Sequence, residues 1–199
     1  IQITQFGCPD VLVVRDIPLP EPGPGQVRIK VAVAGLNYID TYQRSGVYAV
    51  PLPFIPGMEA AGVVEALGQQ VAGLKVGDRV AWCMVPGTYA EYALAPADKV
   101  VPLPDGISLD LAAAVLLQGM TAHYLAISTY PLRPGDVALV HAAAGATGSL
   151  LVQLAKRAGQ QPGGQRANRQ RDERHFHRRA RIMHVRALLR LAVEHHPHH

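Results

Sequence analysis

The sequence predicts an α/β protein in which a β-rich part comes first and a strand–turn–helix unit follows. Up to about residue 99, short β-type runs are separated by Pro and Gly, a spacing typical of a small barrel. From residue 137, an apolar strand-like run, a turn of small residues and a helical repeat follow one another. At 199 residues, 49% of them hydrophobic, the chain is long enough to bury such a core.

Five runs in the first part have the composition and length of strands. Residues 18–25 contain four prolines and form a rigid extended connector between the first two runs. Gly77 and Asp78 form a turn that leads into the fourth run. The predicted strands cover residues 11–14, 26–33, 61–67, 79–82 and 89–94.

Helical patterns begin after residue 104. Ser108 is a plausible N-cap and Asp110 suits the first turn of a helix over residues 111–117. A second helical stretch is expected from Thr121 to about Ser128. The change of pattern places the domain boundary near residues 100–125. We therefore assign residues 1–120 to the β-rich domain and residues 121–161 to the start of the βα domain.

The turn after the predicted strand at residues 137–140 resembles a dinucleotide-binding fingerprint. Ala142, Gly145 and Gly148 have its spacing, with alanine where the first glycine usually stands. Side chains this small let a pyrophosphate approach the N-terminus of the following helix, where unpaired N–H groups favour an anion. An ordinary tight strand-to-helix turn would use the same residues, so the neighbouring sequence has to decide. The apolar positions of the predicted helix are Leu150, Leu151, Leu154 and Ala158.

The net charge of +4 and the isoelectric point near 9.3 come from the end of the chain. Residues 1–161 hold 10 Lys and Arg against 12 Asp and Glu, whereas residues 162–199 hold 9 Arg against 3 acidic residues. Because the excess positive charge is confined to the tail, the first four-fifths of the chain have no basic patch for nucleic acid.

The composition is that of a protein outside the membrane. No apolar run reaches the roughly 18 residues of a membrane span, and the N-terminus lacks a signal-peptide pattern. Cys8 and Cys83 are too few for a disulfide framework and have no metal-ligand spacing, so idle thiols are expected. We expect a cytoplasmic protein with neither a membrane nor a nucleic-acid partner.

Six motifs that resemble those of one enzyme family occur in order, at residues 35–48, 53–64, 76–80, 87–92, 117–122 and 141–145. On these motifs, the sequence is identified as a member of the medium-chain dehydrogenase/reductase superfamily, in its NADPH:quinone oxidoreductase (zeta-crystallin-like) branch. The resemblance covers residues 1–159. It implies a GroES-like catalytic domain, an incomplete Rossmann domain, NADPH as the cofactor, and hydride transfer to a quinone-type acceptor in the cleft between the domains. An enone or enoyl-thioester reductase, or a non-catalytic remnant with a basic tail, stays open.

Residues at two positions argue against a catalytic zinc. The zinc-dependent enzymes that this chain resembles have cysteine where Asn37 stands and histidine where Met58 stands, beside an acid that matches Glu59. An amide and a thioether are poor zinc ligands, and the four-cysteine structural loop is reduced to Cys83. We therefore expect direct hydride delivery to an acceptor that is already electron-poor. Glu59 is expected to be structural rather than catalytic.

The same resemblance implies that Asn37, Asp40, Tyr42 and Tyr48 line the substrate side of the nicotinamide site. The phenols can donate to a developing quinol oxygen, and the amide can hold a ring carbonyl. The structural alternative is that the two tyrosines are half-buried aromatics and that Asp40 forms a turn. Thr121 resembles the threonine that hydrogen-bonds the nicotinamide amide, although threonine also caps helices. The implied cofactor-binding residues are Thr121, Ala142, Ala144, Gly145, Ala146, Thr147 and Gly148.

After Gly159 the family pattern ends. The next residues contain no apolar run for a second Rossmann strand, and Pro and Gly occupy positions 162–164. We expect that strand to be absent and residues 162–199 to form a basic, non-native or disordered tail, as a shifted reading frame would produce. A genuine basic appendage and a metal-binding tail at His195–His199 are the alternatives. In the former, one helix face would carry Ile182, Val185, Leu188, Leu189 and Ala192.

The resemblance implies that full-length relatives are homodimers. The partner of this chain is expected to be a small quinone or enone. The oligomeric state of this chain stays open, and a monomer is one possibility. The sequence also leaves open the physiological acceptor and the choice between NADPH and NADH.

Overall fold

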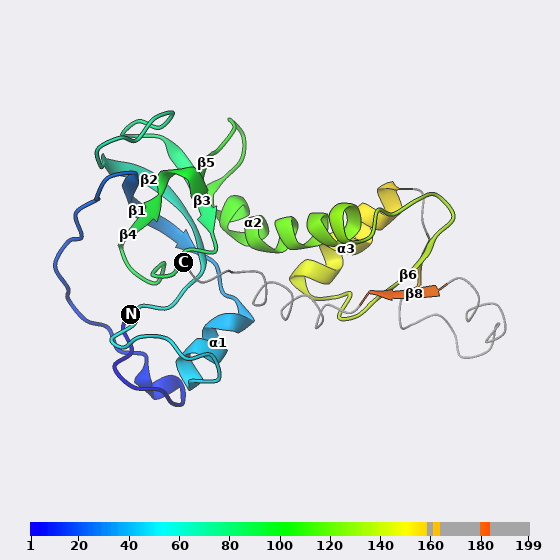
Figure 1. Cartoon of the computed structure of the whole chain (residues 1–199), viewed down its shortest axis with the longest axis horizontal. Helices are drawn as coiled ribbons and strands as arrows, with labels where there is room; N and C mark the ends of the chain where they lie inside the picture. The colour runs from blue at the N-terminus through cyan, green and yellow to red at the C-terminus, as the bar shows by residue number, and fades with distance from the viewer. Residues whose placement is uncertain (159–160, 164–179, 184–199) are drawn as a thin grey trace. The chain divides into compact units, whose positions relative to one another are not determined.

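A computed structural model describes residues 1–158, 161–163 and 180–183 (Figure 1). The chain divides into two compact units, Ile1–Leu117 and Gln118–His199. The division falls within residues 100–125, where the residue pattern changes from β-type to helical.

The first unit is built on one antiparallel sheet of five strands, which is curled in Figure 1. Buried residues alternate at the start of β1, as the period of two requires, whereas β2 and β3 hold continuous buried runs; the aliphatic side chains pack around Trp82. The strands, in the order in which they pair, are β4 (Tyr92–Pro96), β1 (Gln26–Ala34), β2 (Glu59–Leu67), β3 (Arg79–Cys83) and β5 (Val100–Pro102).

Two strand predictions for this unit need correction. Residues 11–14 form no strand: a 3₁₀ turn, η1 (Pro9–Val11), is followed by a single bridge from Val13 to Gln2. Pro9 presets this turn, and among the described residues Val13 pairs with Gln2 alone, so that no strand forms. The run at 89–94 starts pairing only at Tyr92. A second 3₁₀ turn, η2 (Ala97–Lys99), precedes β5, which is too short to produce an alternating pattern.

A short helix that the strand pattern did not predict, α1 (Tyr38–Ser45), follows β1. Its N-cap, Asn37, has an extended backbone, and Asp40 in the first turn accepts a hydrogen bond from the Asn37 N–H at 2.8 Å. Gly46 ends the helix in the left-handed conformation, with φ of 81°. Of the four predicted substrate-side residues, Asp40 and Tyr42 lie in this helix and Asn37 is its N-cap.

The two predicted helical stretches form one continuous helix. α2 (Leu109–His123) continues as a π-helical segment, η3 (Tyr124–Thr129), and Ser108 Oγ accepts from the Leu111 N–H at 3.1 Å, as an N-cap does. Within the described residues, 109–129 form the one helix that is long and apolar enough to cross a membrane by length and composition. Its alanines at 112 and 113 belong to the core of the first unit, and Leu125 belongs to that of the second. Core packing accounts for part of its apolar character, since 33% of the apolar window is buried.

The second unit contains the predicted strand, turn and helix: β6 (Val137–Val140) is followed by α3 (Ala146–Arg157). The described part of its sheet is parallel, in the order β7-β6-β8. β7 (Gln161–Gly163) corrects the expectation that no second strand follows, because Pro162 is tolerated at a sheet edge. In the basic-appendage alternative, Ile182 would begin a helix face. Ile182 lies instead in a strand, β8 (Ala180–Met183), which pairs with β6. The other residues of the basic-tail prediction, including 195–199, lie outside the described residues.

Candidate functional site

Asn37 is held at both of its N–H groups. Its backbone N–H donates to Asp40 Oδ2 at 2.8 Å, and its side-chain Nδ2 donates to Glu59 Oε1 at 3.1 Å. The first bond fixes the N-terminus of α1, and the second ties the side chain to the first residue of β2. Both acceptors are carboxylates, which makes these hydrogen bonds the stronger, charge-assisted kind.

Glu59 joins three elements although its side chain is completely buried. While Oε1 accepts from Asn37, Oε2 accepts from the backbone N–H of Leu117 in α2 at 2.9 Å. A Cβ on Gly35 would lie 2.3 Å from Glu59 Oε1, so the carboxylate occupies space that only glycine leaves open. The carboxylate is thus fixed by β2, α2 and the loop that leads into α1.

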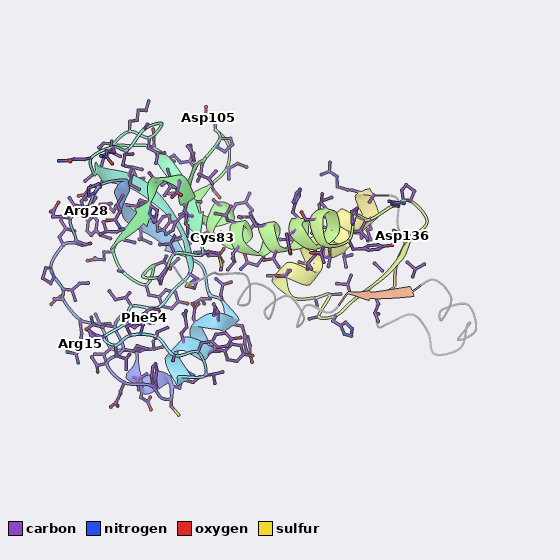
Figure 2. All side chains as sticks on the ribbon, viewed as in Figure 1. Arg15, Arg28, Phe54, Cys83, Asp105 and Asp136 are labelled. Atoms are coloured by element: carbon purple, nitrogen blue, oxygen red, sulfur yellow. The ribbon has the colours of Figure 1, made fainter. Side chains whose placement is uncertain are left out.

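The negative charge of Glu59 affects a cysteine on the neighbouring strand. Cys83, labelled in Figure 2, pairs with Glu59 across β2 and β3. Burial, and after it the negative charge of Glu59, raise the pKa of the Cys83 thiol. The thiol is therefore protonated at neutral pH, and the idle role expected of it stays a prediction.

Asp40 is buried and serves two donors with one oxygen. Besides the Asn37 N–H, Oδ2 accepts from the hydroxyl of Tyr89 at 2.7 Å. Burial, followed by this bond, raises the pKa of Tyr89, so that its phenol stays a donor at neutral pH. Asp40 Oδ1 is buried and has no hydrogen-bond partner within the part of the chain that the structure describes.

Three tyrosines form an edge-to-face series along α1 and the loop after it. The ring centroids of Tyr38 and Tyr42 lie 5.3 Å apart, and those of Tyr42 and Tyr48 are also 5.3 Å apart. Tyr38 is 76% exposed and Tyr48 is 36% exposed, so both hydroxyl-bearing rings face solvent. Such pairs hold rings in a preferred geometry while the phenols stay accessible.

A pocket of about 380 Å³ lies beside α1. It is lined by Asn37 and Asp40 together with Arg44 and Tyr89, and by apolar side chains such as Leu12. Tyr42 and Tyr48 are not part of its wall. The structure therefore brings two of the four predicted substrate-side residues to this pocket and places the other two in the tyrosine series.

The positions that hold zinc ligands in the zinc-dependent enzymes are engaged differently here. The sulfur of Met58 accepts from Gln43 Nε2 at 3.8 Å, and both side chains are buried. Asn37 is bonded to Glu59, as described. Among the residues that the structure describes, no three His, Cys, Asp or Glu side chains are grouped to hold a metal ion.

The predicted cofactor turn joins β6 to α3 in the second unit. Gly145 is the N-cap of α3 and has no side-chain cap, and no acidic residue occupies the first turn of the helix. A Cβ on Gly148 would lie 2.2 Å from the carbonyl oxygen of Ala142, so glycine is required for the helix to pack on the turn. Ala142, Ala144, Gly145 and Ala146 are exposed, which leaves the backbone open to an anion.

Ala142 shows why glycine is usual at the first position of the fingerprint. Its φ is +50°, a left-handed conformation that costs a residue with a Cβ about 1–2 kcal/mol. The other predicted cofactor residues, Thr121 and Thr147, are partly buried. Thr121 lies in the interior of α2, so the helix-cap alternative does not apply to it.

Sequence reasoning missed two contributors to the site. Tyr89, in the loop before β4, contacts Asp40 across 49 positions of sequence, and Leu117 in α2 contacts Glu59 across 58. Neither contact has a local signal in the sequence, because the tertiary fold brings the partners together.

The comparisons with known proteins agree with this architecture. Residues 23–105 match the family model of the alcohol dehydrogenase GroES-like domain. A quinone oxidoreductase of Pseudomonas aeruginosa is 50% identical over 163 residues, which are 81% of this chain and 50% of that protein. A protein of Schizosaccharomyces pombe described as a probable quinone oxidoreductase is 48% identical over 155 residues, 77% of this chain and 47% of its own.

The solved structure of Escherichia coli quinone oxidoreductase complexed with NADPH has a TM-score of 0.80 to this chain, at 34% identity. The match covers 97% of this chain and 61% of that one. The chain is a homologue of the quinone oxidoreductases. It spans about half the length of the curated relatives that it matches. The predicted fold class, a GroES-like domain followed by an incomplete Rossmann part, is confirmed.

Proposed function

We propose that this chain supplies the acceptor-binding residues and the first phosphate-binding turn of a zinc-independent, NADPH-dependent oxidoreductase that reduces quinone-type acceptors. The observation that carries the proposal is the anchoring of Asn37 by two carboxylates beside a pocket, in a homologue of quinone oxidoreductases. An amide fixed in this way presents Nδ2 at a defined position, from which this nitrogen would donate to a ring carbonyl without reorganising during the reaction.

NADPH, when bound, supplies the hydride. The exposed turn from Ala142 to Ala146 would hold its pyrophosphate through backbone N–H groups at the N-terminus of α3, although the Gly145 N–H itself donates to the Ala142 carbonyl oxygen at 2.8 Å. Thr121 would hydrogen-bond the nicotinamide amide. These residues bind and orient the cofactor, and they move no proton.

The acceptor side has two kinds of donor. Asn37 would orient the ring carbonyl of the acceptor, while Tyr42 and Tyr48 would donate to the oxygen that gains charge as the hydride arrives. The exposure of Tyr48 supports this role, because its hydroxyl is accessible to a ligand. Asp40 would keep the N-terminus of α1 in place through its bonds to Asn37 and Tyr89.

The zinc-independent part of the proposal rests on donor chemistry. Where the zinc-dependent enzymes present thiolate and imidazole, this chain presents an amide that donates to Glu59 and a thioether that accepts from Gln43. Neither atom is a good zinc ligand. The substrate then has to be reducible without a Lewis acid, which favours quinones and enones over simple ketones.

The test is NADPH-dependent turnover of benzoquinone by the chain, with cyclohexenone as the competing acceptor class. We expect benzoquinone to react faster, phenanthroline to leave the rate unchanged, and Asn37→Ala to lower kcat on the order of 100-fold. Ser45→Ala, an exposed change on the same helix, is the matched control and should retain the rate. A rate that phenanthroline abolishes, or a chain that never oxidises NADPH, would contradict the proposal.

A further inference from the structure

We infer that Glu59 is a positioning residue, which fixes the amide of Asn37 in a single orientation for the acceptor. The inference rests on the proposed function for what Asn37 contacts, but the orientation itself is a property of this chain. Glu59 touches neither acceptor nor cofactor in this account. It acts through Asn37.

The chemistry of a carboxylate decides which way the amide points. An amide has a nitrogen end that donates and an oxygen end that accepts, and the two ends can exchange by rotation. Glu59 Oε1 only accepts, so the nitrogen of Asn37 has to face it, at 3.1 Å. Glu59 is completely buried, so water does not reach its accepting oxygen, although Asn37 itself is only partly buried.

Glu59 is itself held in place, which a positioning residue requires. Its second oxygen accepts from the Leu117 N–H at 2.9 Å, and the absence of a Cβ on Gly35 leaves room for the carboxylate. The backbone of Asn37 is fixed independently by Asp40. Thus both the side chain and the backbone of Asn37 are tied to buried carboxylates.

A merely structural link would not need this residue type. Burying a carboxylate is costly, and a neutral or apolar side chain often serves as well when only packing is required. A carboxylate is the side chain that offers two acceptors and no donor, so it alone serves Leu117 and dictates the orientation of Asn37 at once. A glutamine at this position would have a single acceptor oxygen for the two donors.

The composition of the chain makes this orientation measurable. The sequence has two asparagines, Asn37 and Asn168, so nuclear magnetic resonance of the chain with isotope-labelled asparagine shows two side-chain amide groups. Asn37→Ala identifies the signals of Asn37. We expect one Nδ2 proton of Asn37 to exchange with water more slowly than the other, and Glu59→Gln to speed its exchange about tenfold or more.

Glu65→Gln is the matched control. Glu65 lies on the same strand, is partly exposed and bonds to Arg28 at 2.6 Å, so its loss should leave the Asn37 signals unchanged. Fast exchange of both Asn37 protons in the unaltered chain would overturn the inference, whether or not Glu59→Gln folds. Exchange that Glu59→Gln leaves unchanged in a folded chain would also overturn it.

Kinetics separate positioning from simple stabilisation. In the active protein we expect Glu59→Gln to lower kcat on the order of 100-fold while KM for NADPH is unchanged, because a small misplacement of a reacting group has effects of this size. The same change added to Asn37→Ala should have no further effect, since Glu59 acts through Asn37. A further loss of the same size would overturn the inference. An inactive parent chain would contradict the proposed function, whereas the exchange measurement tests the positioning by itself.

Discussion

Tyr89 and Asp40 illustrate how a single side-chain contact supports the site. The Tyr89 hydroxyl donates to the oxygen of Asp40 that also caps α1, so one buried carboxylate connects the helix to a distant loop. The sequence predicted Asp40 as a site residue from a resemblance and offered a turn-forming role as the alternative. Its observed contacts are those of a helix cap, and its direct contact with a substrate stays a prediction.

Tyr89→Phe is expected to lower the free energy of unfolding by about 1 kcal/mol at neutral pH, because Asp40 loses a hydrogen-bond donor. The raised pKa of Tyr89 adds a pH dependence. Its contribution to stability is complete below the ordinary tyrosine value of about 10 and is lost as the pH rises above it, since the unfolded chain releases the proton first. Denaturant unfolding at neutral and alkaline pH measures both effects. A variant that loses stability as steeply as the parent above pH ~10 would contradict the prediction.

At the scale of elements, the sequence predicted those strands and helices whose residue patterns lie within a single short stretch. β1, β2, β3 and the strand–turn–helix around Gly145 have strong periodic patterns and were predicted from the sequence. α1 was missed because its eight residues span only about two helical turns, which is too short for a repeat to stand out, although Asn37, Asp40 and Gly46 are its capping signals. The contacts of Glu59 could not be predicted, since they join residues 22 and 58 positions away.

Substitution of Gly46 tests the left-handed conformation that ends α1 and the packing of Phe6 against it. Its φ is +81°, and a Cβ there would lie 2.9 Å from the ring of Phe6. Gly46→Ala is therefore expected to cost about 1–2 kcal/mol for the backbone conformation and about 1–3 kcal/mol more for the contact. Gly25→Ala is the matched control, because Gly25 has a φ of +73° and nothing within 4 Å. Equal losses of unfolding free energy in the two variants would show that Phe6 does not pack as described.

At the scale of the whole molecule, the chain joins a β-rich unit with a five-stranded sheet to a second unit whose described sheet has three strands. The first unit contains the GroES-like match and all the predicted acceptor-side residues. The second contains the cofactor turn, which the sequence predicted because its chemistry lies within one short stretch. β7 and β8 were not predicted, since their pairing with β6 is not evident in a stretch rich in Pro, Gly and Arg.

The measurement that tests the central claim most directly is a fluorescence titration of the chain with NADPH, with NADH in parallel. We expect saturable NADPH binding that Gly148→Ala weakens about tenfold or more, because its Cβ would lie 2.2 Å from the Ala142 carbonyl in the phosphate-binding turn. Gly119→Ala, whose Cβ would meet nothing closer than 4.0 Å, should bind like the parent. Absence of saturable binding, or binding that Gly148→Ala leaves intact, would contradict the account.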